Sequence, residues 1–199
     1  MSAADERAKV LKAVRVDFDK ALILAENVSD AWYRCQSLAA VARFAPEGKV
    51  IPVANKALKA ASLGADAYKR MAVAAWPVRA LAERGKFGHA NKVLPPVLVD
   101  ANEVEPPVSK ISALELLWEA VWPFSVDAKQ LVLDTLLSAC QVTNSWRAGR
   151  IMNHVALVVA TEDKAHAQRL IDSMRESAYK RQAQKRLDAS RTERVRSFF

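Results

Sequence analysis

Residues 66–85 read DAYKRMAVAAWPVRALAERG, and their apolar side chains recur at steps of three and four residues. Met71, Ala75, Val78 and Ala82 therefore share one stripe of an α-helix, and the charged residues fall outside it. The first aspartate suits a helix N-cap and the final glycine suits a helix end. The stretch predicts an amphipathic helix whose apolar side needs a neighbouring element to cover it.

The beginning of this stretch recurs along the chain. Four segments place an aromatic residue just before basic residues, and a fifth has valine in place of the aromatic residue: AWYR from 31, AYKR from 67, SWR from 145, AYKR from 178, and PVSK from 107. Successive starts are separated by 36, 40, 38 and 33 residues. A period between 20 and 50 residues is typical of repeat proteins, in which each unit buries its apolar face only against its neighbours.

Periodicity of this kind predicts eleven helices and no strand. The apolar run 155–160 is interpreted as part of a buried helix, Pro77 is expected to kink or split its helix, and Pro95-Pro96 is expected to break the next one. The predicted spans are 3–15, 17–28, 30–45, 49–63, 66–84, 87–102, 107–122, 125–141, 145–160, 162–176 and 178–192. The predicted fold is all-α, a right-handed α-solenoid of about five antiparallel helical hairpins over residues 1–177. Residues 178–199 form a basic capping helix and tail of the same domain.

Composition places the chain among soluble globular proteins. It has 199 residues, of which 51% are hydrophobic and 26% charged, so it can bury a core and is not expected to be disordered. The first residues lack the apolar core of a signal peptide, and no apolar run approaches the ~18 residues that span a bilayer. The two cysteines, Cys35 and Cys140, are interpreted as buried thiols. We therefore expect a cytoplasmic protein that does not engage a membrane.

Positive charge is concentrated near the end of the chain. Residues 175–199 carry a net charge of +5, which leaves +3 of the total +8 for the other 174 residues. This basic tail has two interpretations. It is a surface for nucleic acid or an acidic partner, or, as we favour, a polar capping helix that frays into a solvated tail. Phe198-Phe199 is either disordered or a small docking anchor.

Several segments resemble the tetratricopeptide-like family of helical repeats. Residues 31–33, AWY, are similar to its small–Trp–Tyr start; residues 85–90, GKFGHA, are similar to its turn into the second helix, and residues 17–21, DFDKA, repeat part of that turn. Residues 30–34 and 66–70 are also similar to the Asp-x-x-x-Arg start of HEAT-like repeats. Either resemblance implies a curved surface that binds other proteins, usually peptides or helices, with no catalytic residue.

A recurring basic column is the main candidate for partner binding. In a solenoid, equivalent positions line up one repeat apart, so these residues could grip carboxylates of a partner or phosphates of a nucleic acid. The interpretation we favour is structural: each basic group pairs with Asp30, Asp66 or another acid of the neighbouring hairpin. The candidate residues are Arg34, Arg70, Lys110, Arg147, Arg150, Lys180 and Arg181. The aromatic residues beside them, Trp32, Tyr68, Trp146 and Tyr179, are expected to fill space between helices.

Reactive constellations are weak. The three histidines have no metal-like spacing, and no glycine-rich nucleotide loop occurs, so no catalytic, cofactor or metal site is predicted. Glu115 and Glu119, like Glu162 and His166, stand four residues apart and are interpreted as solvated helix faces.

The favoured function is a non-catalytic scaffold whose concave face binds a peptide, a helix or another copy of the chain. Binding of the nucleic-acid backbone by the basic column and tail is the alternative. A DNA-repair enzyme on a HEAT-like scaffold is the least favoured, because it needs exposed aromatic residues beside a carboxylate. Trp76, Trp118 and Trp122 are instead interpreted as packing residues.

Overall fold

A computed structural model describes residues 2–199, and within them the protein has eleven α-helices, two short 3-10 helices and no strand. The eleven predicted helices are all confirmed, and the run 155–160 belongs to a helix rather than a strand. The elements in order are α1 Ala3–Ala13, α2 Phe18–Glu26, α3 Ala31–Phe44, η1 Glu47–Lys49, α4 Val50–Ser62, α5 Ala67–Glu83, α6 Phe87–Val99, η2 Asp100–Asn102, α7 Pro107–Val121, α8 Lys129–Val142, α9 Trp146–Val159, α10 Lys164–Ser173 and α11 Ala178–Asp188.

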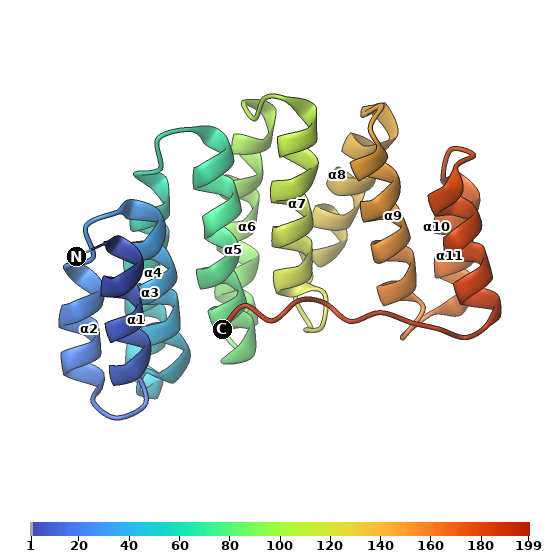
Figure 1. Cartoon of the computed structure of the whole chain (residues 1–199). Helices are drawn as coiled ribbons and strands as arrows, with labels where there is room; N and C mark the ends of the chain where they lie inside the picture. Colours follow the sequence, from blue (N-terminus) through green and yellow to red (C-terminus); the bar gives the residue numbers. More distant parts are fainter. Residues whose placement is uncertain (1) are drawn as a thin grey trace.

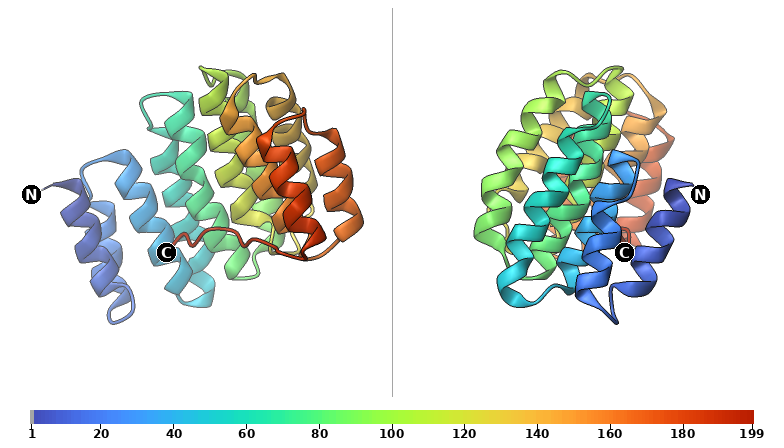
Figure 2. Two further views of the ribbon diagram at one scale, coloured as in Figure 1. Left: turned by 45° about the vertical axis from the view of Figure 1, so that its right-hand side comes forward. Right: turned by 90° about the vertical axis from the view of Figure 1, so that its left-hand side faces the viewer.

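The helices stand side by side in a row that follows chain order from the N-terminus to α11 (Figure 1). The odd-numbered helices form one layer, in which each of them packs against the next, from α1 to α11. Each odd-numbered helix from α1 to α9 also packs against the even-numbered helix that follows it, which completes a helical pair, and within residues 2–199 α11 ends the row without such a partner. Figure 2 shows the same stack from two further directions.

The sequence repeat marks the odd-numbered layer. Its five starts lie at the beginnings of α3, α5, α7, α9 and α11. Asp30 accepts a hydrogen bond from the Tyr33 amide at 3.1 Å, and Asp66 accepts one from the Lys69 amide at 2.7 Å, so each aspartate caps its own helix. The repeat is therefore a helix-start signal that recurs once in each pair.

Small residues allow close packing between helices. Gly149 of α9 faces Tyr179 of α11, and a Cβ atom at this glycine would lie 2.9 Å from the Tyr179 ring. Any larger residue at Gly149 would therefore push α11 away from α9. Cys35 and Cys140 are buried and free, which confirms their interpretation as buried thiols.

Pro95 and Pro96 do not break their helix, contrary to prediction, and Pro77 does not split its helix. Pro77 lies inside continuous α5 and lacks the N–H that would bond to the Val73 carbonyl. The Cys35 thiol of α3 donates a hydrogen bond to this carbonyl at 3.4 Å, so the acceptor freed by the proline is not left without a partner. Pro95 and Pro96 lie within α6, and their side chains are exposed.

After α11 the chain turns back, and its last residues run in extended form across the odd-numbered helices toward α5 (Figure 1). The expectation of a solvated tail is therefore wrong for this segment. Among residues 2–199, no helix combines the length and apolar character needed to cross a membrane.

Candidate functional site

The reversal after α11 is built by a tight helix-terminating turn. The Ser190 amide donates to the Leu187 carbonyl at 3.0 Å, and the Arg191 amide donates to the Arg186 carbonyl at 2.8 Å. Ser190 has φ 53°, a left-handed conformation that glycine adopts more easily than serine. This pair of bonds directs residues 191–199, hereafter the docked segment, back over the helix layer.

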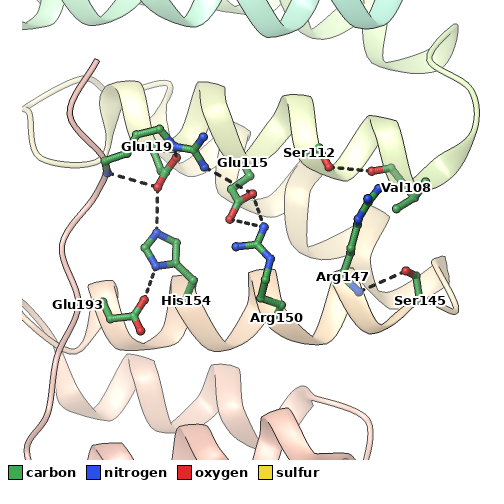
Figure 3. A network of polar contacts seen from close by, with 10 residues as sticks. Val108, Ser112, Glu115, Glu119, Ser145, Arg147, Arg150, His154 and Glu193 are labelled. Carbon is green, nitrogen blue, oxygen red and sulfur yellow. Dashed lines mark hydrogen bonds and ion pairs between the residues drawn. The ribbon is translucent and has the colours of Figure 1, made fainter. Parts of the chain in front are cut away.

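The first part of the docked segment lies against α9. The Glu193 amide donates to the Leu157 carbonyl at 3.1 Å, the main-chain hydrogen bond that ties the segment to this helix. The Glu193 carboxylate lies 2.5 Å from His154 Nδ1 (Figure 3). It also pairs with Arg186 of α11.

Two buried carboxylates of α7 receive the middle of the docked segment. The Glu119 side chain is 2% exposed, pairs with the Arg196 guanidinium and lies 2.9 Å from His154 Nε2 (Figure 3). The Glu115 side chain is 4% exposed, accepts two hydrogen bonds from Arg150 at 2.8 and 3.1 Å, and lies 3.7 Å from the Arg196 guanidinium. The prediction of a solvated face is wrong for this pair, because cations from α9 and from the docked segment cover it.

His154 of α9 contacts Glu119 of α7 through Nε2 and Glu193 of the docked segment through Nδ1. Burial disfavours its charged form, but hydrogen bonds to Glu119 and Glu193 outweigh burial, so the pKa of His154 is raised above its ordinary value. Burial likewise opposes ionisation of Glu193, yet the hydrogen bonds from His154 and Arg186 prevail and lower the pKa of this carboxyl. Both shifts favour an ion pair between His154 and Glu193.

The last two residues of the docked segment pack on aromatic rings. Phe198 is 6% exposed and meets Trp76 of α5 edge to face, with ring centroids 5.3 Å apart. The Trp76 indole N–H donates to the Phe198 carbonyl at 3.0 Å, and Trp32 of α3 lies behind Trp76 at 6.0 Å. The docking-anchor alternative for these phenylalanines is therefore the one confirmed.

Two arginines complete this aromatic end. The Arg79 guanidinium lies 5.6 Å from the Phe198 ring and the Arg43 guanidinium 5.0 Å from the Phe199 ring. Glu83 contacts both arginines, at 2.5 Å from Arg43 and 2.7 Å from Arg79, and so holds the two cations in place.

The surface that the docked segment covers is called the odd-helix face below. It is formed by side chains of four helices: Trp32 and Arg43 of α3, Trp76 and Arg79 of α5, Glu115 and Glu119 of α7, and His154 of α9.

Most of the predicted basic column lies at helix starts rather than on this face. Arg34 donates to the Val28 and Ser29 carbonyls at 2.7 and 3.1 Å and thereby closes the turn before α3. Arg70 of α5 pairs with Asp100 at 3.3 Å and with Glu103 at 3.0 Å, two acids that follow α6 in the same helical pair.

The other column members are also held locally. Lys180 donates to the Asp172 and Met174 carbonyls at 3.0 Å each, and Arg181 pairs with exposed Glu176 at 2.8 Å. The Arg147 guanidinium lies over the neighbouring Trp146 ring at 5.6 Å, and Lys110 lies on the first turn of α7.

The structure brings one member of the predicted set, Arg150, to the odd-helix face. The suggested partners Asp30 and Asp66 act instead as N-caps, although Asp66 also lies 3.8 Å from Lys69.

The aromatic residues of the repeat differ in burial. Trp32, Tyr68 and Tyr179 are partly buried against the core, whereas Trp146 is 62% exposed. The space-filling prediction is therefore wrong for Trp146, whose ring lies beside the Arg147 guanidinium on the surface. Trp118 and Trp122 are buried, in agreement with their interpretation as packing residues.

Reactive groups elsewhere are few. Burial raises the pKa of Cys140 to about 12 and also raises the pKa of Cys35, so both remain thiols at neutral pH. Across residues 2–199 no three His, Cys, Asp or Glu side chains gather in a way that could hold a metal ion.

Comparison with models of protein families, with curated proteins and with solved structures finds no match to this chain. The tetratricopeptide-like and HEAT-like resemblances therefore rest on the sequence segments quoted above and on the paired helices. The class of protein that the structure itself defines is an all-α stack of packed helix pairs.

Sequence reasoning did not identify the acceptor residues of the odd-helix face. Trp76, Glu115, Glu119 and His154 stand on three helices, and the residues that they contact lie as far as 122 positions away. The phenylalanine pair at the end of a basic segment was the one signal that pointed to docking.

Proposed function

We propose that the protein is a non-catalytic helical-repeat scaffold that mediates protein–protein interaction by binding an extended polypeptide on its odd-helix face. The observation that carries the proposal is the docked segment. It is a stretch without secondary structure, held by ion pairs, a main-chain hydrogen bond and an edge-to-face contact between aromatic rings. A surface that holds one extended segment has the shape and chemistry to hold another.

The proposal includes a finer architecture. The row of helix pairs is proposed to be a right-handed α-solenoid of about five hairpins with α11 as its cap, and the odd-helix face is proposed to be concave. The support is the recurrence of one helix-start signal in each pair, together with the resemblance to tetratricopeptide-like and HEAT-like repeats. That resemblance is an analogy at the level of fold.

Selection of peptides from a random library tests the proposed function. The target is the full chain carrying Arg196→Ala and Phe198→Ala, which weaken the docked segment and leave the odd-helix face intact. We expect selected peptides to bind this target and to lose binding when Trp76→Ala or Glu119→Gln is added. A library that yields no binder dependent on these two residues would contradict the proposal.

Binding of the nucleic-acid backbone is the alternative proposal. Its support is the net charge of +5 over residues 175–199, which includes Arg191 and Arg194 on the exposed side of the docked segment. Pairing of Arg70, Arg150 and Arg196 with acids weighs against it, because these cations are already neutralised. A gel shift at low salt that disappears steeply with added salt would favour this alternative.

A further inference from the structure

We infer that the odd-helix face selects extended segments with an arginine two residues before an aromatic residue, and that residues 191–199 are an internal competitor for such a segment. The inference rests on the proposed function and adds to it the chemistry of the partner and the way in which access is controlled. Its motif is the pair Arg196 and Phe198, which contact the buried carboxylates of α7 and the Trp76 ring.

The acidic site on α7 requires a cation from the ligand. Glu115 and Glu119 lie one helical turn apart and are almost fully buried. Arg150 and His154 of α9 supply partners, and Arg196 supplies a third cation that reaches both carboxylates. An acidic ligand residue would add negative charge beside the two buried carboxylates, and a neutral residue would leave Glu119 without its guanidinium partner, so both are disfavoured.

The geometry also favours arginine over lysine. The Arg196 Nε group pairs with Glu119 while a terminal nitrogen of the same side chain lies 3.7 Å from Glu115. A planar guanidinium can address two carboxylates at once, whereas a lysine ammonium acts as a single point charge.

The second site selects an aromatic residue. The Trp76 ring contacts the Phe198 ring, and the Trp76 indole N–H donates to the Phe198 carbonyl. Trp76 therefore binds both the side chain and the main chain of this residue. Arg79 and Arg43 beside it attract π-faces and repel basic side chains. The two sites therefore differ in sign, and their order sets the direction of the ligand across α7 and then α5.

Two features allow the docked segment to leave the odd-helix face. Five of its nine residues are exposed: Arg191, Thr192, Arg194, Arg196 and Ser197. It leaves α11 through Ser190, whose left-handed conformation is unfavourable for serine. Segments with few buried contacts open at lower free energy than packed helices, so the face can be uncovered while the helices stay folded.

A fluorescent peptide with the sequence of residues 191–199, RTERVRSFF, tests the inference by anisotropy. The receptor is the full chain with Arg196→Ala and Phe198→Ala, and circular dichroism checks that it is folded. We expect the peptide to bind this receptor at least about tenfold more tightly than the unmodified chain, since a tethered segment competes at millimolar effective concentration.

Two matched reagents locate the interaction. A peptide with glutamate at the position of Arg196 is expected to lose at least about tenfold in affinity, because it adds a negative charge to the acidic site. Adding Glu119→Gln to the receptor is expected to weaken the original peptide as well.

A second receptor avoids changes in both the face and the motif. Ser190→Pro forbids the left-handed turn and removes its amide donor, so it should release residues 191–199 and increase peptide affinity. Ser190→Gly keeps the turn and serves as its control.

Equal affinity of the two peptides, or an affinity unchanged by Glu119→Gln, would overturn the inference. So would a peptide that binds neither released receptor. Library peptides that bind the same face without the arginine–aromatic pattern would overturn it too, while leaving the proposed function standing.

Discussion

The two halves of the odd-helix face hold the docked segment by different physics. Over α7 and α9 the contacts are ionic: Glu119 pairs with Arg196, and His154 lies between Glu119 and Glu193. Over α3 and α5 they are aromatic and centre on Trp76. Ion pairs must offset the desolvation of buried charge, whereas burial of an aromatic ring is favourable in itself. The comparison teaches that the aromatic half supplies most of the binding free energy and the ionic half sets register and direction.

Removal of the buried carboxylate should have the largest effect on stability. Glu119→Ala leaves Arg196 and His154 without their shared partner, and we expect the free energy of unfolding to fall by about 3 kcal/mol. Thermal unfolding should register this as a decrease in Tm of roughly 6–12 °C. Glu176→Ala is the control, because Glu176 pairs with Arg181 on the open surface. Equal Tm values for the two variants would break the distinction between a buried and an exposed pair.

Loss of the aromatic anchor should undock the segment without unfolding the helices. Phe198→Ala removes a ring whose burial is worth about 2 kcal/mol. We therefore expect hydrogen exchange at the Glu193 amide to increase roughly thirtyfold. Phe199→Ala should have a smaller effect, because Phe199 is only partly buried. If Phe199→Ala acts as strongly, the ring at 198 is not the anchor.

Relief of the strain at Ser190 should strengthen docking on both halves of the odd-helix face alike. Ser190→Gly is expected to gain about 1 kcal/mol in docking, because glycine adopts positive φ without the Cβ clash. The reciprocal change is Gly85→Ser, at φ 66° in the equivalent turn after α5, and it should lose a similar amount. Chemical denaturation measures both changes. The opposite signs are the essential result, and two changes of the same sign would contradict the proposed origin of the strain.

Proton binding should affect the ionic half alone, and it is the smallest expected effect because burial of His154 opposes its charged form. Burial opposes the charged form of His154, but hydrogen bonds to Glu119 and to Glu193 of the docked segment raise its pKa, so the contribution of the Glu193 bond to docking is complete below the ordinary histidine value and is lost as pH rises through the raised pKa. The lowered pKa of Glu193 adds a contribution that is complete above the ordinary glutamate value and is lost as pH falls through the lowered pKa. Docking should therefore be strongest between about pH 4.3 and pH 6.5.

The other charged groups at this point are Arg186 of α11, Glu119 of α7 and Arg196 of the docked segment. Protection of the Glu193 amide measured against pH checks the expected window. His154→Gln should remove the loss of protection on the alkaline side and leave the loss on the acid side. Alkaline loss that survives in His154→Gln would assign it to another group.

Local signals explain how much of the fold the sequence predicts. Helix caps and apolar periodicity act within a few residues of one another, so all eleven helices and the five repeat starts could be located. Pro77 shows the limit of this reasoning, because the thiol that satisfies the freed carbonyl comes from Cys35, on another helix. No local pattern connects those two residues.

The candidate site was less predictable for the same reason. Glu115 and Glu119 look like an exposed pair of acids when they are read along α7 alone. Their burial depends on Arg150, 35 residues from Glu115, and on Arg196, 77 residues from Glu119. The basic column could be recognised in the sequence because its members recur at helix starts. Arg34 and Lys180, for example, donate hydrogen bonds to carbonyls just before their own helices.

One consequence of the helix arrangement is mechanical. Within residues 2–199 each odd-numbered helix leans on the next, whereas even-numbered helices pack mainly against odd-numbered ones. Between the pair α5–α6 and the pair α7–α8 the packing runs mainly through the odd-numbered helices α5 and α7, so the stack can open there on the side of the even-numbered helices. The nine docked residues run across the odd-numbered helices in extended form (Figure 1). An extended segment of nine residues spans at most about 30 Å, so it limits how far these helices can separate. Their departure would lengthen the reach of the molecule and make it more compliant.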